Sequence, residues 1–310
     1  MTVYNYTVKQ KIDGKRVVAL GFFDGVHLGH RALLQRAKEE ARERGALLAV
    51  FTFAAETFGK KGVGRLYSTE EKLEIFEELG VDEVIIADFG TVANIAAEDF
   101  VVGTLIGDIG AVCTVCGEDF RFGQGARGDL SLLERLMRES GGDCISVTDE
   151  CLGGVKVSTT KIKELLADGD VAGANALLGA PLYLSGVVEK GLGLGKKLGF
   201  PTVNTPIGAK GEILRRGVYR SRLSVDGKDY DAITNVGICP TFEEREVHQE
   251  TFVLCEIGDL YGKKIKVFLL EFLRDEKRFD SKNDLIMQIN VDINRIKGAQ
   301  NEFLNNESEK

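Results

Sequence analysis

Short apolar runs alternate with amphipathic segments through the first half of the chain. Runs rich in Val, Ile, Leu or Phe predict buried strands over residues 17–22, 46–53, 82–87 and 111–116. Apolar residues that recur every three or four positions predict helices over residues 30–44, 69–79, 96–106 and 131–139. Such alternation is typical of a parallel sheet with helices on both faces, so we expect a Rossmann-like α/β domain.

The pattern changes in the second half of the chain. Two further helices are predicted over residues 160–167 and 171–178, and Gly179-Ala180-Pro181 then interrupts the helical periodicity. Residues 183–273 read as short strands separated by glycine-rich turns, which predicts an all-β domain, a small antiparallel barrel. Asp226-Gly227 between two of these strands predicts a tight hairpin.

A last amphipathic segment begins after Ser281 and predicts a terminal helix. The chain of 310 residues is longer than most single hydrophobic cores, which favours two domains. We therefore expect an N-terminal α/β domain over residues 1–181, a C-terminal barrel with its helix over residues 182–305, and a polar tail over residues 306–310.

The charge balance argues against some partners. With 40 Lys and Arg against 48 Asp and Glu, the formal net charge is −8 and no basic patch is evident, so we expect no nucleic-acid partner. The first six residues lack the charged and apolar regions of a signal peptide, and no segment is apolar enough to span a bilayer. We therefore expect a cytoplasmic protein without a membrane partner.

A turn rich in glycine and histidine follows the first of these predicted strands. Its sequence is Gly21-Phe22-Phe23-Asp24-Gly25-Val26-His27-Leu28-Gly29-His30, and it holds two of the chain's three histidines. The turn leads into a predicted helix, whose N-terminus attracts anions, and Gly21, Gly25 and Gly29 let backbone amides approach a ligand. His27 and His30 add two imidazoles, so we predict a phosphate-binding site at this turn.

Two later segments can complete this site. The segment Gly117-Glu118-Asp119-Phe120-Arg121-Phe122-Gly123-Gln124-Gly125 follows a predicted strand, and its glycines and aromatic residues suit a loop over a flat ligand or an ordinary connector. The segment Ser158-Thr159-Thr160-Lys161-Ile162-Lys163 places hydroxyls and lysines at a helix start, where they suit a phosphate chain or a plain N-cap.

A glycine-rich segment stands out in the C-terminal half. Four glycines within residues 191–199 form a flexible flap whose amides can wrap phosphates. Pro201 fixes the chain before Thr202, so that Thr202 and Asn204 project from the same face of an extended segment. A hydroxyl and an amide oxygen on one face can bind a hard cation such as Mg²⁺, with phosphates in its other coordination positions.

In this order, these segments resemble the bacterial bifunctional riboflavin kinase/FAD synthetases over most of the chain. The histidine turn, the aromatic segment and the hydroxyl-rich helix start resemble the adenylyltransferase module of that family. The glycine-rich segment with Pro201-Thr202-Val203-Asn204 closely resembles the riboflavin kinase module, as do residues 235–242, 250–251, 260–262 and 273–276. The resemblance implies that the barrel phosphorylates riboflavin to FMN with ATP. It also implies that the α/β domain adenylylates FMN to FAD and releases pyrophosphate.

The resemblance also assigns residues in the adenylyltransferase module. Those implied to hold the ATP phosphates are His27, His30, Ser158, Thr159 and Lys163, with Asp170 supporting that helix region. The other residues implied at the nucleotide are Gly21, Phe23, Asp24, Gly25, Gly29 and Asp119, and those at the flavin are Phe120 and Phe122. The FMN phosphate has its second pKa near 6 and is already ionised at neutral pH, so this reaction needs no general base. Two imidazoles, a helix N-terminus and a lysine would offset the negative charge that gathers there.

In the kinase module the acceptor is the 5′-hydroxyl of the ribityl chain. Its pKa lies far above neutrality, so a carboxylate that takes the proton favours phosphoryl transfer. The resemblance assigns this role to Glu250 and metal binding to Thr202 and Asn204. The residues that it assigns to the nucleotide here are Gly193, Gly195 and Lys196. In the kinase module, the residue implied at the flavin is Arg274. We expect His248 in a solvent-exposed loop.

Two departures from the family's pattern lie in the adenylyltransferase module. Lys163 stands where relatives usually carry arginine, and Ala54-Ala55-Glu56-Thr57 stands where they usually carry Asp-Pro-His-Pro. These changes leave open a riboflavin kinase with a weak or inactive adenylyltransferase domain. A flavin- or nucleotide-sensing protein without turnover is a further alternative, although a sensor has no need of a base such as Glu250.

Overall fold

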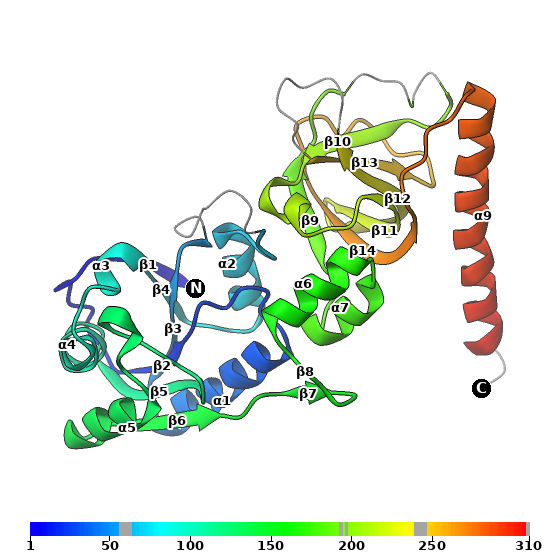
Figure 1. Ribbon diagram of the computed structural model, residues 1–310. Coiled ribbons are helices and arrows are strands. Elements are labelled where there is room, and N and C mark those ends of the chain that lie inside the picture. Colours follow the sequence, from blue (N-terminus) through cyan, green and yellow to red (C-terminus); the bar gives the residue numbers. More distant parts are fainter. Residues whose placement is uncertain (56–63, 192–194, 196–197, 239–246, 308–310) are drawn as a thin grey trace. The chain divides into compact units, whose positions relative to one another are not determined.

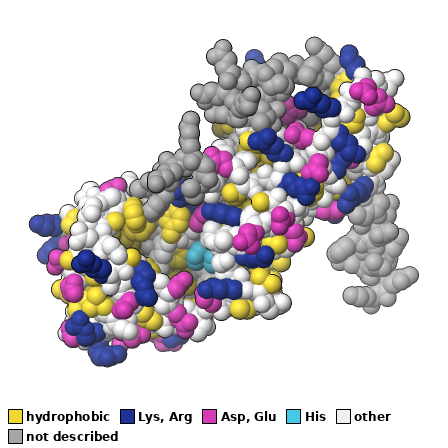
Figure 2. All heavy atoms as spheres, viewed as in Figure 1, with side chains coloured by type: hydrophobic (Ala, Val, Ile, Leu, Met, Phe, Trp, Pro, Cys, Tyr) yellow, Lys and Arg dark blue, Asp and Glu magenta, His cyan; other side chains and the backbone are white. Residues whose placement is uncertain are grey.

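A computed structural model describes residues 1–55, 64–191, 195, 198–238 and 247–307, with side chains up to residue 297 (Figures 1 and 2). The chain forms two compact units, Met1–Lys161 and Ile162–Lys310. They divide within helix α6 (Thr159–Asp168), so helix α7 (Val171–Leu178) lies in the second unit. The limits of the functional domains, residues 1–181 and 182–305, stay a prediction.

The first unit is built on a six-stranded parallel sheet with the strand order β1-β4-β3-β2-β5-β6. The strands are β1 (Thr2–Tyr6), β2 (Arg16–Leu20), β3 (Leu47–Phe53), β4 (Glu83–Ala87), β5 (Ala111–Gly117) and β6 (Asp143–Val147). Every neighbouring pair is parallel, which confirms the predicted α/β class.

Helices connect these strands. They are α1 (Leu28–Arg44), α2 (Thr69–Glu78), α3 (Phe89–Val92), α4 (Ala97–Asp99), the π-helix η2 (Phe100–Asp108), the 3₁₀ helix η3 (Gln124–Ala126) and α5 (Leu130–Glu139). The helix expected over residues 96–106 is therefore α4 followed by a π-helix. A short antiparallel hairpin, β7 (Cys151–Leu152) and β8 (Val155–Lys156), precedes α6.

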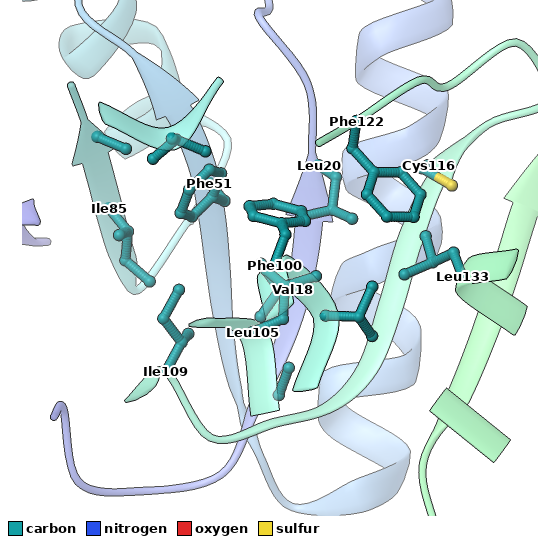
Figure 3. Close-up of a cluster of buried hydrophobic side chains, with 14 of the residues drawn as sticks. Val18, Leu20, Phe51, Ile85, Phe100, Leu105, Ile109, Cys116, Phe122 and Leu133 are labelled. Atoms are coloured by element: carbon teal, nitrogen blue, oxygen red, sulfur yellow. The ribbon is translucent and has the colours of Figure 1, made fainter. Parts of the chain in front are cut away.

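The central strands are buried on both faces, which explains their continuous apolar sequence. All five residues of β2 are buried. One face of the sheet packs against η2 and α5, where Val18 and Leu20 meet Phe51, Phe100 and Leu133 in one apolar cluster (Figure 3). Because side chains alternate along a strand, Val17 and Ala19 point to the opposite face, where α1 packs on β2, β3 and β5. The carboxyl end of β2 is thereby fixed, and with it the turn that follows.

The second unit holds a six-stranded antiparallel sheet with the order β10-β13-β12-β11-β14-β9. Its elements are β9 (Tyr183–Val187), β10 (Thr202–Pro206), the 3₁₀ helix η4 (Gly208–Glu212), β11 (Gly217–Val225), β12 (Lys228–Ile238), β13 (Val247–Val253), β14 (Lys264–Arg274) and α9 (Lys282–Glu307). The Glu189 amide, just beyond β9, donates to the Asn204 carbonyl of β10 at 2.9 Å and nearly closes the sheet into a barrel. The predicted barrel and terminal helix are confirmed.

Two local predictions are also confirmed. Asp226 and Gly227 connect β11 to β12, and both have positive φ angles, 52° and 73°, as a two-residue hairpin requires. Among the helices of the described ranges, none combines the length and the apolar content needed to cross a bilayer.

Two candidate active sites

The first site lies on the turn between β2 and α1, at the carboxyl end of the parallel sheet. His27 is the N-cap of α1, and its Nδ1 accepts a hydrogen bond from the His30 amide at 3.3 Å. The two imidazole rings stack with their centroids 3.7 Å apart and their planes 14° from parallel. Histidine atoms reach the surface beside hydrophobic side chains in Figure 2. The structure therefore brings the two predicted histidines together at a helix N-terminus.

Burial keeps these imidazoles neutral. It lowers the pKa of His27 to about 4, against the opposing effect of the nearby Asp24 and Asp149 carboxylates. Burial lowers the pKa of His30 as well, helped by His27 and by the ammonium of Lys72. Since Nδ1 of His27 is an acceptor, its proton lies on Nε2. In the absence of ligand the histidines thus offer N–H donors, and the positive potential comes from the N-terminus of α1.

Several residues that the sequence assigned to the nucleotide hold the turn in shape. Phe23 is fully buried, with its ring edge-on to His30 at 5.1 Å and to Phe76 at 5.6 Å. Asp24 is buried, and its Oδ1 accepts from the Leu66 amide at 3.0 Å. A contact between Phe23 and a nucleotide would therefore fall to its backbone.

Two of the three glycines of the turn are required by packing or by backbone conformation. A Cβ at Gly21 would lie 3.1 Å from the buried Phe23 ring, closer than ordinary van der Waals contact. Gly25 has a φ angle of 91°, which favours glycine. A Cβ at Gly29 would lie 3.4 Å from the His27 ring, an ordinary contact distance, so packing does not require glycine there.

The hydroxyl-rich helix start lies partly against the histidine turn. Thr159 Oγ1 donates to the Asp24 carbonyl at 2.9 Å, and Ser158 Oγ accepts from the Lys161 amide at 3.2 Å, as an N-cap does. Lys163 follows on the same helix but in the second unit, as does Asp170, which caps α7 through a 2.9 Å hydrogen bond from the Gly173 amide.

The aromatic segment follows β5, the neighbour of β2. Asp119 is exposed there. Phe120 and Phe122 stack with centroids 5.7 Å apart, and Phe122 is 7% exposed and packs on Phe100. Phe122 is thus mainly a core residue, and Phe120 is the more accessible of the two aromatic rings.

The second site lies on the outer face of the barrel. In the sheet register Asn204 of β10 and Asn235 of β12 both stand opposite Glu250 of β13. Thr202 lies two residues from Asn204 and therefore on the same face. The residues on either side of Glu250 in β13, Gln249 and Thr251, point inward and are buried. The structure therefore brings Thr202, Asn204 and Glu250 together and adds Asn235, which the sequence did not single out.

Glycines let the backbone pass close to these side chains. A Cβ at Gly191 would lie 2.5 Å from Asn204 Nδ2, and a Cβ at Gly195 would lie 3.2 Å from Thr202 Oγ1. Gly193 and Lys196 lie outside the described residues, as do Glu56 and Thr57 in the first unit.

Glu250 occupies a partly desolvated position. Its side chain keeps an exposed surface, yet the protein atoms around the carboxyl raise its pKa, and His248 partly opposes this rise. His248 itself lies half-buried in β13, two residues from Glu250 and on the same face. The expectation that His248 lies in an exposed loop is therefore wrong, because the strand begins at Val247.

Arg274 is engaged within the second unit. Its guanidinium donates to the Asp292 carboxylate of α9 at 2.8, 3.0 and 3.1 Å, and both side chains are largely buried. Asn235 Nδ2 donates to Glu276, just beyond β14, at 3.4 Å. The structure thus shows Arg274 tying β14 to α9, and a contact with flavin stays a prediction.

Comparisons with known proteins agree with the family that the motifs resemble. Residues 9–161 match the family model described as FAD synthetase, and residues 178–299 match the model described as riboflavin kinase. The chain is 38% identical over 279 residues to the bifunctional riboflavin kinase/FMN adenylyltransferase of Escherichia coli (strain K12), covering 88% of this chain and 89% of the relative. It is 31% identical to the protein of the same name from Bacillus subtilis (strain 168), covering 93% of each chain.

A solved structure shares the fold over nearly the whole chain. It is titled as a macrolide-efflux protein from Streptococcus pneumoniae, is 27% identical and superposes with a TM-score of 0.85, covering 95% of this chain and 98% of the other. Together with the order of the two modules, the sequence identities place this chain in the family of bifunctional riboflavin kinase/FMN adenylyltransferases.

Proposed function

We propose that the barrel phosphorylates riboflavin on its outer face, with Glu250 as the proton acceptor. The observation that carries this proposal is the register that sets Asn204 and Asn235 on either side of Glu250. Glu250 would take the proton of the ribityl 5′-hydroxyl while that oxygen attacks the γ-phosphorus of ATP and the bond to ADP breaks. Its raised pKa makes the carboxylate a better proton acceptor than an ordinary glutamate.

Thr202 and Asn204 suit the magnesium ion that accompanies ATP. A hydroxyl and an amide oxygen on one strand face are hard donors, and Gly191 leaves the room beside Asn204 that a side chain would fill. When bound, Mg²⁺ would offset the charge of the transferring phosphate. Thr202 and Asn204 would hold it, and the Gly195 backbone would lie against the phosphates.

The turn between β2 and α1 is the proposed site of FMN adenylylation. The FMN phosphate attacks the α-phosphorus of ATP, and pyrophosphate leaves. The first amides of α1 and Nε2–H of His27 would donate to the ATP phosphates, with Ser158 and Thr159 beside them. No base is required, because the attacking phosphate is already ionised. Asp119 and Phe120 would lie near the nucleotide and the flavin. Lys163 would offset the charge of the distal phosphates, and Asp170 would support that helix region.

One incubation tests both assignments. Purified protein with riboflavin, ATP and Mg²⁺ should yield FMN and then FAD, separated by chromatography. Glu250→Gln should lose FMN formation while it still converts supplied FMN to FAD, and His27→Ala should do the reverse. A normal kinase rate in Glu250→Gln refutes the proposed base. Equal loss of both activities in either variant contradicts two separate sites, and FMN without FAD in the unaltered protein refutes the first site.

A further inference from the structure

A lysine that no motif includes lies beneath the histidine turn. Lys72 of α2 is 1% exposed. Its Nζ donates to the Phe53 carbonyl at 3.0 Å, to the Phe22 carbonyl at 3.1 Å and to Thr52 Oγ1 at 3.4 Å. Thr52 Oγ1 in turn donates to the Phe22 carbonyl at 3.0 Å. One ammonium thus joins the turn after β2 to the carboxyl end of β3.

The Phe22 ring belongs to the same arrangement. Lys72 Nζ lies 4.7 Å from its centroid, and Arg65 Cζ lies 5.3 Å from it. Burying an ammonium is costly, and an apolar side chain of the same length could fill the space. The oxygen acceptors and the ring face compensate for that burial, which points to a use for the charge itself.

The turn that Lys72 contacts has a strained backbone. Phe23 has a φ angle of 56° and Val26 one of 41°, conformations that non-glycine residues adopt only when their surroundings impose them. These residues carry the chain from β2 to the His27 N-cap. The hydrogen bonds of Lys72 anchor the start of this strained segment at Phe22.

We propose that Lys72 is a positioning residue for FMN adenylylation: it fixes the turn between β2 and α1 to the end of β3 and so holds His27, His30 and the first amides of α1 in place. This inference rests on the proposed role of that turn.

The charge of Lys72 also reaches His30. Together with His27, it adds to the effect of burial that lowers the pKa of His30, whereas the Asp24 and Asp149 carboxylates act on His27 in the opposite direction. Removal of the lysine charge should therefore raise the pKa of His30. A role of Lys72 in packing alone would leave this pKa unchanged.

Lys72→Met, which keeps the length and removes the charge, tests the proposal in the full chain. We expect kcat/KM for adenylylation of supplied FMN to fall by about 10- to 100-fold, the range that a misplaced site produces. The riboflavin kinase rate of the same molecules should stay within about twofold and reports on the second unit. Lys72→Arg, which keeps the charge, should recover part of the loss. Adenylylation by Lys72→Met within about twofold of the unaltered protein would overturn the proposal.

Arg16→Met is the matched control for a loss of folding. Arg16 is also 1% exposed and donates to backbone carbonyls, among them those of Ile12 and Ile109, and to the buried Glu83 carboxylate, but it lies at the amino end of β2, away from the turn. It should lower the unfolding temperature of the first unit and leave kcat/KM for adenylylation unchanged in the folded protein. Equal losses of that kcat/KM in Arg16→Met and Lys72→Met would mark Lys72 as a structural residue only.

Proton NMR provides the second readout, since the chain has three histidines and single substitutions assign their ring signals. The His30 pKa should rise in Lys72→Met and stay unchanged in Lys72→Arg and Arg16→Met. An unchanged His30 pKa in Lys72→Met refutes the electrostatic contact. If His27→Ala abolishes adenylylation while Lys72→Met does not affect it, only this inference fails. If His27→Ala is also fully active, the proposed site fails with it.

Discussion

Gly191→Ala should slow riboflavin phosphorylation and change the stability of the fold only slightly. The added Cβ would lie 2.5 Å from Nδ2, 2.8 Å from Cγ and 3.1 Å from Oδ1 of Asn204. Ordinary van der Waals contact begins at about 3.4 Å, so the amide has to move by roughly 1 Å. The amide is the end of a side chain and can swing aside, so we expect the free energy of unfolding to change by less than about 1 kcal/mol.

The same displacement is large on the scale of a catalytic site. A shift of about 1 Å in a positioning group can cost on the order of 100-fold in rate. If Asn204 holds the metal–nucleotide complex, kcat/KM for riboflavin phosphorylation should fall by about 10- to 100-fold, with a raised KM for MgATP. Conversion of supplied FMN to FAD should stay unchanged, because it belongs to the other unit.

The assay is steady-state kinetics of both reactions on one preparation, with thermal unfolding measured alongside. Gly258→Ala is the matched control, since a Cβ there would meet no atom within 4 Å. It should leave both reactions unchanged. A kinase rate in Gly191→Ala equal to that of Gly258→Ala would refute the argument that Asn204 acts at the position seen in the structure.

Three further outcomes are expected. The kinase kcat/KM should rise with pH as Glu250 loses its proton. The apparent pKa of this rise should lie above the value of about 4.5 that is typical of glutamate, and Glu250→Gln should no longer show the rise. Asp292→Asn leaves the largely buried Arg274 without its carboxylate and should lower the free energy of unfolding by about 3–5 kcal/mol. Urea unfolding measures this loss, and a loss below about 1 kcal/mol would show that the ion pair is not essential. His27 has a pKa of about 4 when folded and about 6.5 when unfolded, so the unfolded chain binds more protons between these values. Stability should therefore fall by about 3 kcal/mol as the pH drops from 6.5 to 4. His27→Gln should lack this part of the pH dependence in denaturant titrations, and an identical pH dependence in both proteins would contradict it.

In the parallel sheet of the first unit, the strands that the sequence predicted correctly are those covered on both faces. All residues of β2 are buried, and its apolar run is continuous. The edge strands β1 and β6 were missed because they are only partly buried, and their sequences, Thr-Val-Tyr-Asn-Tyr and Asp-Cys-Ile-Ser-Val, mix polar and apolar residues. A search for apolar runs therefore finds the centre of a parallel sheet and misses its edges.

The residues within one motif could be predicted, but their partners on other elements could not. Thr202 and Asn204 are two residues apart, and this spacing alone places them on one face of a strand. Asn235 reaches the same face only because β12 pairs with β13 in a register that sets it opposite Glu250. The burial of Lys72 could not be predicted for the same reason. It follows Ser68 and Glu71, which form a capping box, so the sequence indicates an exposed residue at a helix start.

The charge state of the histidine turn could not be predicted from its own residues either. Glycines, two imidazoles and a helix start predicted a phosphate site, and the structure does place the imidazoles at the N-terminus of α1. Burial lowers the pKa of both imidazoles, and at His30 the ammonium of Lys72, which lies more than forty residues later in the sequence, adds to this effect. Because both imidazoles are neutral before ligand binds, attraction of ATP to this turn begins with other groups, among them the backbone amides and the dipole of α1, and any positive charge on the histidines would follow the arrival of the phosphates.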